Sequence, residues 1–258
     1  MECHQQSFPI LKTMIAIFKK ELHSFFNSPI GYLIVLVFLT LNGLFLWVFR
    51  QEFNVFDYGF ADLSNFFLLI PWVFLFLVPA ITMRSISEEK KLGTLELLLI
   101  KPISKFKIIL GKFLGALFVG IIALVPTIIY VSAISNLGIL EGNVDMGVVS
   151  GSYFGTFFLL ALYCSMGVYA STVSDNQIFA FILGALLCFL VFFGPESIST
   201  LFTDGSTQQF IKGLGAKAHF EDISKGILDT RDVIYFLTLT AFFIYLAISG
   251  LSHKKTVK

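Results

Sequence analysis

Residues 30–49, IGYLIVLVFLTLNGLFLWVF, form an apolar run that contains no charged residue. In an α-helix a run of this length spans about 30 Å, which matches the hydrocarbon core of a bilayer. Because lipid offers no hydrogen-bond partners, the backbone of such a run must pair its own N–H and C=O groups, which makes it a helix. The stretch therefore predicts a transmembrane helix.

Further blocks of the same kind follow along the chain. Together with residues 30–49, the predicted spans are residues 63–83, 108–134, 146–173, 177–194 and 233–251. Charged residues make up only 14% of the 258 residues, whereas a soluble domain is about a quarter charged. The strands of a membrane barrel alternate apolar and polar residues over about 10 positions, and these blocks do not. We predict an all-α membrane protein with six transmembrane helices.

The charges on either side of the spans indicate the orientation of the chain. With the N-terminus in the cytoplasm, that side holds 13 of the 18 Lys and Arg residues, and the opposite side holds 11 of the 17 Asp and Glu residues. Both termini are therefore expected in the cytoplasm, with the protein in the inner membrane of the cell. A single membrane domain is predicted for residues 14–258, after a flexible segment of residues 1–13, and Met14 is a candidate start.

An amphipathic helix is predicted directly before the first span. Its apolar residues recur at helical spacing, and they are Met14, Ile15, Phe18, Leu22, Phe25 and Phe26. Lys19, Lys20 and His23 fall on the opposite face. A helix with one apolar and one basic face lies in the membrane interface, here on the cytoplasmic side.

The loop of residues 84–107, between the second and third spans, carries a run of leucines outside the predicted membrane core. Ser87 is expected to cap a helix whose first turn holds Glu88 and Glu89. Pro102 is expected to stop the apolar run that follows. Two interpretations of the leucines remain open at this point. They form either a re-entrant or interfacial helix at the base of the bundle, or a docking element for a soluble partner.

The external segment, residues 195–232, is predicted to form a cap of short interfacial helices. Its apolar residues fall into three clusters: Ile198, Leu201 and Phe202; Phe210, Ile211 and Leu214; and Phe220, Ile223 and Ile227. Glycines break these clusters apart, at Gly205, Gly213, Gly215 and Gly226. Asp229 or Thr230 is expected to cap the last span.

The sequence shows no signature of catalysis or of ATP binding. No Walker A sequence surrounds Lys112, the only lysine that glycine precedes. The histidines are scattered outside the spans, so neither a metal site nor a cofactor is indicated. Gly111 with Gly115, and Gly151 with Gly155, have the spacing of close helix packing.

The predicted spans carry almost no ionisable residue, apart from Lys112 near a boundary. Proton-coupled transporters and pumps place such residues inside the membrane, where they mark the pathway. A membrane protein without them and without an ATP site is either passive or driven by a partner. The cysteines Cys3, Cys164 and Cys188 show no paired spacing and are expected to be small core residues.

Residues 88–98, EEKKLGTLELL, with Pro102 downstream, resemble the hallmark of the ABC-2 family of ABC transporter permeases. That hallmark is an acidic pair followed by Gly-Thr-x-Glu-Leu-Leu and a proline. Residues 19–22, KKEL, with the following phenylalanines, and the stretch from His219 to Asp232 are similar to the permease subunit of the gliding-motility-associated ABC transporter. The resemblance covers most of the chain and implies the ABC-2 permease fold.

In that family the loop forms a coupling helix in a groove of a separate ATPase subunit. By this resemblance, the residues implied to orient the loop are Glu88, Glu89, Gly93, Thr94 and Glu96, and those implied to fill the groove are Leu95, Leu98 and Leu99. The implied second contact is the N-terminal helix, with Phe18, Lys19, Lys20, Leu22, Phe25 and Phe26. Gly93 would permit close backbone approach.

The function that the resemblance implies is a permease subunit of an exporter. It is not an enzyme itself, is energised by an ABC ATPase subunit and pairs with a second permease subunit in the lipid. Nothing indicates a nucleic-acid partner. The alternative function is a non-transporting membrane scaffold or assembly subunit, while a membrane-embedded lipid enzyme lacks a catalytic cluster. No span shows the polar lining that would indicate a substrate.

Overall fold

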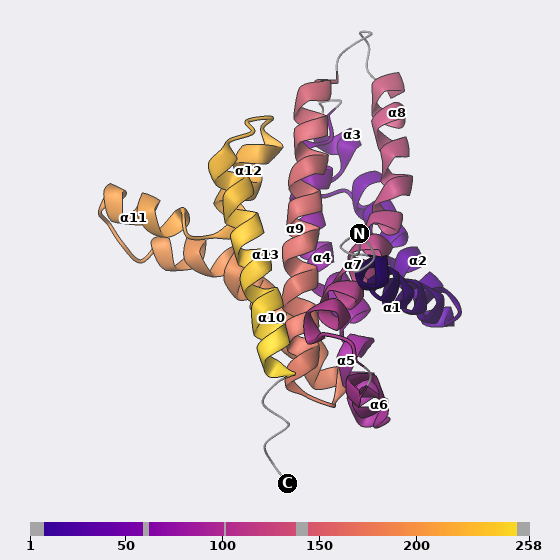
Figure 1. Cartoon of the computed structure of the whole chain (residues 1–258). Helices are drawn as coiled ribbons and strands as arrows, with labels where there is room; N and C mark the ends of the chain where they lie inside the picture. Colours follow the sequence, from indigo (N-terminus) through magenta and orange to yellow (C-terminus); the bar gives the residue numbers. More distant parts are fainter. Residues whose placement is uncertain (1–7, 59–61, 101, 138–143, 252–258) are drawn as a thin grey trace, which may run out of the picture.

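The chain folds into a bundle of helices, which Figure 1 shows in a computed structural model. The structure describes residues 8–58, 62–100, 102–137 and 144–251, with side chains from residue 14 onward. Within these ranges there is no β-strand. The long helices follow from the sequence, because uncharged apolar blocks in lipid satisfy their backbone groups only as helices.

Within the described ranges, six helical segments are long and apolar enough to cross a membrane, as predicted. They are α2 (Pro29–Gly43) with the π-helical η1 (Leu44–Val48); α4 (Ser64–Thr82); α7 (Lys105–Leu124) with η2 (Val125–Thr127) and α8 (Ile128–Leu137); α9 (Met146–Val173); α10 (Gln177–Ser199); and α13 (Thr230–Gly250). Their ends lie within a few residues of the predicted ones. The largest difference is in α10, which continues through Pro195 to Ser199.

The remaining helices precede the spans or join them. They are α1 (Phe8–Phe26), α3 (Val55–Tyr58), α5 (Arg84–Lys91), α6 (Thr94–Ile100), α11 (Gly205–Lys212) and α12 (Ala216–Ser224). Residues 8–13 belong to α1, so this part of the flexible segment predicted for residues 1–13 is helical instead. Pro9 allows this because the first turn of a helix needs no N–H from that residue. Residues 1–7 lie outside the described ranges.

The central helix of the bundle is α9, which packs against α4, α7, α10 and α13 and against the short helices α5 and α12 (Figure 1). Most of α9 is buried, whereas only a minority of the residues of α2, α10 and α13 are buried. Small residues permit this close packing, which stabilises helices in lipid by van der Waals contact. At Gly167 of α9, for example, a Cβ would lie 2.9 Å from Thr82 Cβ of α4.

Both predicted glycine pairs lie at close helix contacts. The pair of α7 lies against α1, where a Cβ on Gly111 would be 2.9 Å from Ile17 and a Cβ on Gly115 would be 2.9 Å from Glu21. The pair of α9 lies against α12, where a Cβ on Gly151 would be 2.9 Å from a backbone carbonyl oxygen. The glycines therefore position α1 and α12, which lie at opposite ends of the bundle.

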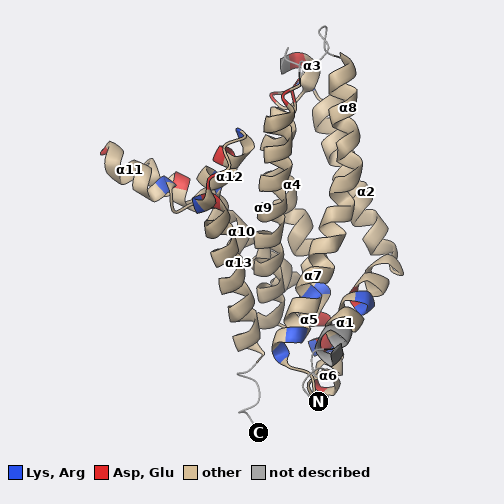
Figure 2. Cartoon of the chain, turned by 45° about the horizontal axis from the view of Figure 1, so that its top comes forward, with Lys and Arg blue, Asp and Glu red and all other residues tan. Residues whose placement is uncertain are grey.

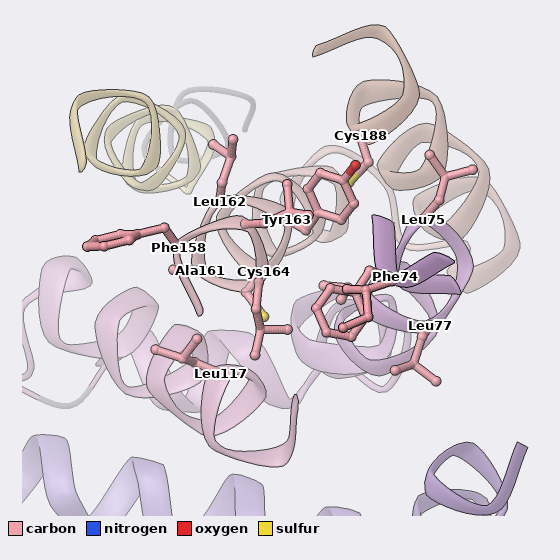
Figure 3. Packing of buried hydrophobic residues seen from close by; sticks show 14 of the residues in the cluster. Phe74, Leu75, Leu77, Leu117, Phe158, Ala161, Leu162, Tyr163, Cys164 and Cys188 are labelled. Carbon is pink, nitrogen blue, oxygen red and sulfur yellow. The ribbon is translucent and has the colours of Figure 1, made fainter. Parts of the chain in front are cut away.

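Figure 3 shows the core around α9, where Tyr163 and Cys164 lie among side chains of the neighbouring helices, including Phe74 of α4. Cys164 and Cys188 are buried free thiols. This agrees with the expectation that they are core residues and form no disulfide. Cys3 lies outside the described residues.

The external segment forms short helices between α10 and α13, and α11 points away from the bundle while α12 packs on it (Figure 1). The His219 ring of α12 lies with Nδ1 2.5 Å from Asp232 Oδ1 at the start of α13. Its Nε2 lies 2.9 Å from the carbonyl oxygen of Gly213. Asp229 caps α13 by accepting a hydrogen bond of 2.9 Å from a backbone N–H of its first turn. These contacts fix α12 to the start of the last span.

Candidate functional site

A helical hairpin extends from the end of the second span. Met83 joins α4 to α5, and Leu92 and Gly93 join α5 to α6. Gly93 has a φ of +69°, in the left-handed region that costs other residues about 1–2 kcal/mol. Nothing in the described chain lies within 4 Å of the position its Cβ would take. The turn, rather than a close approach within this chain, is therefore the structural reason for glycine here.

The N-terminus of α5 is capped by a residue from a different helix. The expected cap was Ser87, but α5 begins at Arg84, and Ser87 Oγ instead donates a hydrogen bond to the carbonyl oxygen of Met83. The cap is Ser171 of α9, whose Oγ accepts hydrogen bonds from the N–H groups of Ile86 (2.8 Å) and Ser87 (3.0 Å). The same hydroxyl donates to Met83 O over 3.2 Å. Caps usually precede their helix directly, so the local pattern indicated the wrong serine.

A buried lysine joins α5 to α1 and α7. Lys112 of α7 is only 1% exposed, although the sequence placed it near a span boundary. Its Nζ lies 2.7 Å from Glu21 Oε1 of α1 and 3.0 Å from Glu89 Oε2 of α5. It also donates a hydrogen bond of 2.5 Å to the carbonyl oxygen of Ser85. Two hydrogen bonds and one further ion pair thus surround the ammonium group, which compensates for removing the charge from water.

Lys20 of α1 extends this set of ion pairs to the surface. Its Nζ lies 2.6 Å from Glu89 Oε1. Burial lowers the pKa of Lys20, but the hydrogen bond and the charge of Glu89 outweigh it, so the pKa is raised above its ordinary value. Two lysines and two glutamates therefore form one neutral group between three helices. We call Lys20, Glu21, Glu89 and Lys112 the basal ion cluster.

The apolar side of α1 packs on the bundle. The predicted apolar residues that contact the core are Leu22, Phe25 and Phe26. Phe18 contacts Phe118 of α7 edge to face, with ring centroids 5.6 Å apart, while Lys19 is exposed. The sequence placed this face in the membrane interface. In the structure, other helices of the chain cover a large part of it.

The hairpin exposes leucines, but not the set that the resemblance implied. Leu95 is only 7% exposed and packs in the core, so it cannot fill a groove of another protein in this arrangement. Leu98 and Leu99 are half-buried, because positions three and four residues after Leu95 lie on the same face of the helix. The large apolar side chains that remain exposed are Leu92 (67%), Leu97 (65%) and Ile100 (80%). We call these three residues the hairpin tip.

The polar residues implied to orient the loop lie in different environments. Glu88 pairs with Arg84 within α5, with Oε2 3.1 Å from Nε, and Glu89 belongs to the basal ion cluster. Thr94 Oγ1 donates a hydrogen bond of 3.4 Å to the carbonyl oxygen of Glu89. Glu96 is exposed. The structure therefore brings Glu89 and Thr94 together but leaves Glu96 on the surface.

Sequence reasoning assigned no role to Lys112 or Ser171. A signal existed for Lys112, because an isolated lysine in an apolar span is unfavourable unless it finds a partner. No such signal marks Ser171, because a serine in a buried helix ordinarily bonds to the backbone of its own helix. Its role depends on where α5 lies.

The two ends of the bundle differ in charge. Figure 2 shows Lys and Arg gathered mainly on α1, α5 and the start of α7, and Asp and Glu mainly at the opposite end, near α3 and on α11 and α12. The hairpin and the basal ion cluster lie at the basic end. The structure thus defines a multi-pass helical membrane protein with a short helical hairpin held at the basic end of its bundle.

The chain belongs to the ABC-2 transporter family. A family model described as ABC-2 family transporter protein matches residues 15–255. The match includes most of α1, the hairpin and all six candidate spans. A search of curated proteins gives no match. The protein is therefore a membrane transport component of the permease type.

Proposed function

We propose that the chain is the permease subunit of an ABC-2-type exporter in the inner membrane, driven by a separate ATPase subunit. In this proposal α6 is the coupling helix, and the ATPase covers the hairpin tip. Both termini lie in the cytoplasm with the hairpin, because the side that is rich in Lys and Arg stays in the cytoplasm.

The hairpin tip is the observation that carries this proposal. Single exposed leucines are common on protein surfaces. Leu92, Leu97 and Ile100, however, lie close together in sequence on a hairpin at the basic end of the bundle. A soluble partner with an apolar groove would remove them from water, in the manner of a helix bound in a groove.

The rigidity of α5 further supports the proposal. Ser171 and the basal ion cluster hold α5 to three other helices. Its last turn is also tied to α9, because Lys90 Nζ donates a hydrogen bond to the carbonyl oxygen of Thr172. A preorganised surface loses little conformational entropy when it binds. Because α5 is held rigidly, a displacement of α6 would also displace the transmembrane helices to which α5 is attached.

The test is the affinity of the purified permease, in lipid nanodiscs, for its co-expressed ATPase. The double variant Leu97→Glu/Ile100→Glu places two carboxylates in the proposed contact, where burial without a partner is unfavourable. We expect binding to weaken by at least about tenfold, which is about 1.4 kcal/mol. Leu201→Glu is the matched control, since Leu201 is 79% exposed but follows α10 in the external segment.

Unchanged affinity in the double variant would remove the hairpin from the proposed contact. A native chain that purifies from its own cells without any ATPase would favour the scaffold alternative. The two results are distinct, because the first concerns one surface and the second concerns the transporter class.

The orientation has its own test. In a Cys3→Ser background, Lys91→Cys should be protected from a membrane-impermeant thiol reagent added outside intact cells, and Ser206→Cys should react. Both positions are exposed in the structure. External labelling at Lys91→Cys would reverse the proposed topology.

A second permease subunit, identical or different, completes the proposed transporter. The helix α10 supports this, since Ile178, Ile182 and Leu186 expose a stripe of apolar side chains along it that lipid or protein must cover. Native mass spectrometry of the complex would count its subunits.

We further propose gliding motility as the process that this exporter serves, because residues 19–22 and the stretch from His219 to Asp232 resemble that subfamily. Normal gliding in a deletion strain would contradict this assignment.

A further inference from the structure

The basal ion cluster is the main link between α1 and the hairpin. Helix α1 packs against α7 and α2 rather than against α5. Among the described side chains, the polar interactions that join α1 to α5 are ionic. Lys20 contacts Glu89 directly, and Lys112 holds Glu21 and Glu89 to the same ammonium group. The position of the hairpin relative to α1 is therefore set largely through these charges.

Of the two lysines, Lys112 has the stronger influence on geometry. The side chain of Lys20 is 58% exposed and that of Lys112 only 1%. Solvent screens ion pairs at the surface, whereas the low dielectric of the interior strengthens a buried pair and makes an unpaired charge unfavourable. A movement that pulled Glu89 away from Lys112 would leave the buried ammonium group with only one of its two carboxylate partners. The two groups are therefore expected to move together.

The hairpin has other attachments, which lead to different helices. The chain itself joins α5 to α4 at Met83, and Ser171 and Lys90 join α5 to α9. None of these reaches α1. If Lys112 were absent, a displacement of the hairpin would still reach α4 and α9, but its main route to α1 and to the start of α7 would be lost.

We propose that Lys112 is a positioning residue that makes α1 and the α5–α6 hairpin move as one body. This inference rests on the proposed function, because the bound ATPase is what would displace the hairpin. A displacement of α6 then moves α1 and α7 through the ion pairs, and it moves α4 through the chain connection at Met83. Lys112 contacts neither the ATPase nor any transported molecule in this scheme, since it is buried behind Glu89.

The first test uses the permease alone. Spin labels at Ser24→Cys on α1 and Lys91→Cys on α5, in a Cys3→Ser background, report the distance between α1 and the hairpin in nanodiscs. We expect one narrow distance distribution in the otherwise native chain and in Lys112→Arg, which keeps the charge. We expect a broad distribution in Lys112→Met. Arg84→Met is the matched control, because its ion pair lies within α5, and it should leave the distribution narrow.

A second variant covers the case in which Lys112→Met does not accumulate. Glu21→Gln has nearly the same shape and removes only the charge that α1 contributes, so it should also broaden the distribution. A distribution that stays narrow in Lys112→Met, or in Glu21→Gln where the first variant cannot be made, overturns the proposal. A loss of general stability would instead broaden the control as well.

The second test adds the ATPase and traps it with ADP and vanadate. A third label at Thr230→Cys, at the outer end of α13, serves as the reference. In the otherwise native chain, trapping should shift both the Ser24–Thr230 and the Lys91–Thr230 distances. In Lys112→Met, only the Lys91–Thr230 distance should shift. Equal shifts in both chains overturn the role of Lys112, whereas an ATPase that does not bind the native chain overturns the proposed function and leaves the first test valid.

Discussion

Replacing Ser171 with alanine should open α5 without unfolding the bundle. The first N–H groups of a helix have no partner within that helix, and Ser171 Oγ accepts hydrogen bonds from two of them, those of Ile86 and Ser87, at 2.8 and 3.0 Å. Both residues are fully buried. Water therefore cannot easily replace the lost hydroxyl.

The expected size of the effect follows from these two bonds. A buried donor left without a partner costs about 1–3 kcal/mol, and the loss of a single cap costs about 0.5–2 kcal/mol. Some relaxation of the first turn will offset part of the loss. We therefore expect α5 to be destabilised by about 2 kcal/mol, which corresponds to an increase of about 30-fold in the equilibrium constant for its opening.

The measurement is hydrogen–deuterium exchange of the peptide that covers residues 84–91, in nanodiscs. The matched control is Ser165→Ala, since Ser165 is equally buried in α9 but donates only to the carbonyl oxygen of Leu162 in its own helix. The control should leave exchange in α5 unchanged. If Ser171→Ala also leaves it unchanged, the cross-helix cap is not what holds α5.

Three further changes test other parts of the structure. Gly167→Val should destabilise the protein by about 1–3 kcal/mol in thermal unfolding, because the new side chain meets Thr82; a midpoint like that of the unmutated protein would contradict the close α4–α9 contact. Gly93→Ala should destabilise the turn between α5 and α6 by about 1–2 kcal/mol, because Gly93 has a left-handed φ, and should speed hydrogen exchange in α6. Gly43→Ala is the control: nothing lies within 4 Å of its new Cβ, so it should change neither stability nor exchange in α6. Hydrogen bonds from two hydroxyl side chains at the start of α11 lower the pKa of Asp204 to about 2. Its capping of α11 should therefore be complete above the ordinary pKa of aspartate and weaken as the pH falls toward 2. Hydrogen exchange in α11 should then depend more strongly on pH in the native chain than in Asp204→Asn. The same pH dependence in both chains would contradict this.

The spans were predictable because hydropathy is a property of each segment by itself. The caps of α9 and α13 were equally local, since Asp145 accepts hydrogen bonds from the N–H groups two and three positions later, and Asp229 accepts one from the N–H group two positions later. The α5 cap was mispredicted because its acceptor lies 84 residues away from Ser87 along the chain. No pattern within one loop contains that information.

The leucines of the hairpin show the same limit. A helical run such as LELLLI has apolar residues on every side, so its sequence does not indicate which face turns inward. The core contact of Leu95 decides this, and it leaves Leu97 and Ile100 exposed. The structure therefore turns Leu95 inward, whereas the coupling role implied for this segment stays a prediction.

From the amino-acid sequence alone it could be predicted that this chain is helical, that it crosses a membrane in six segments and that it resembles one transporter family. These properties follow from segment length, the absence of charge and a short local motif, because lipid forces each apolar block to satisfy its own backbone. The packing of the helices, in contrast, buries Lys112, pairs it with Glu21 and Glu89 and places Ser171 at the start of α5. Those contacts join residues as far as 91 positions apart, and a buried charge is stable only where packing brings its partners to it.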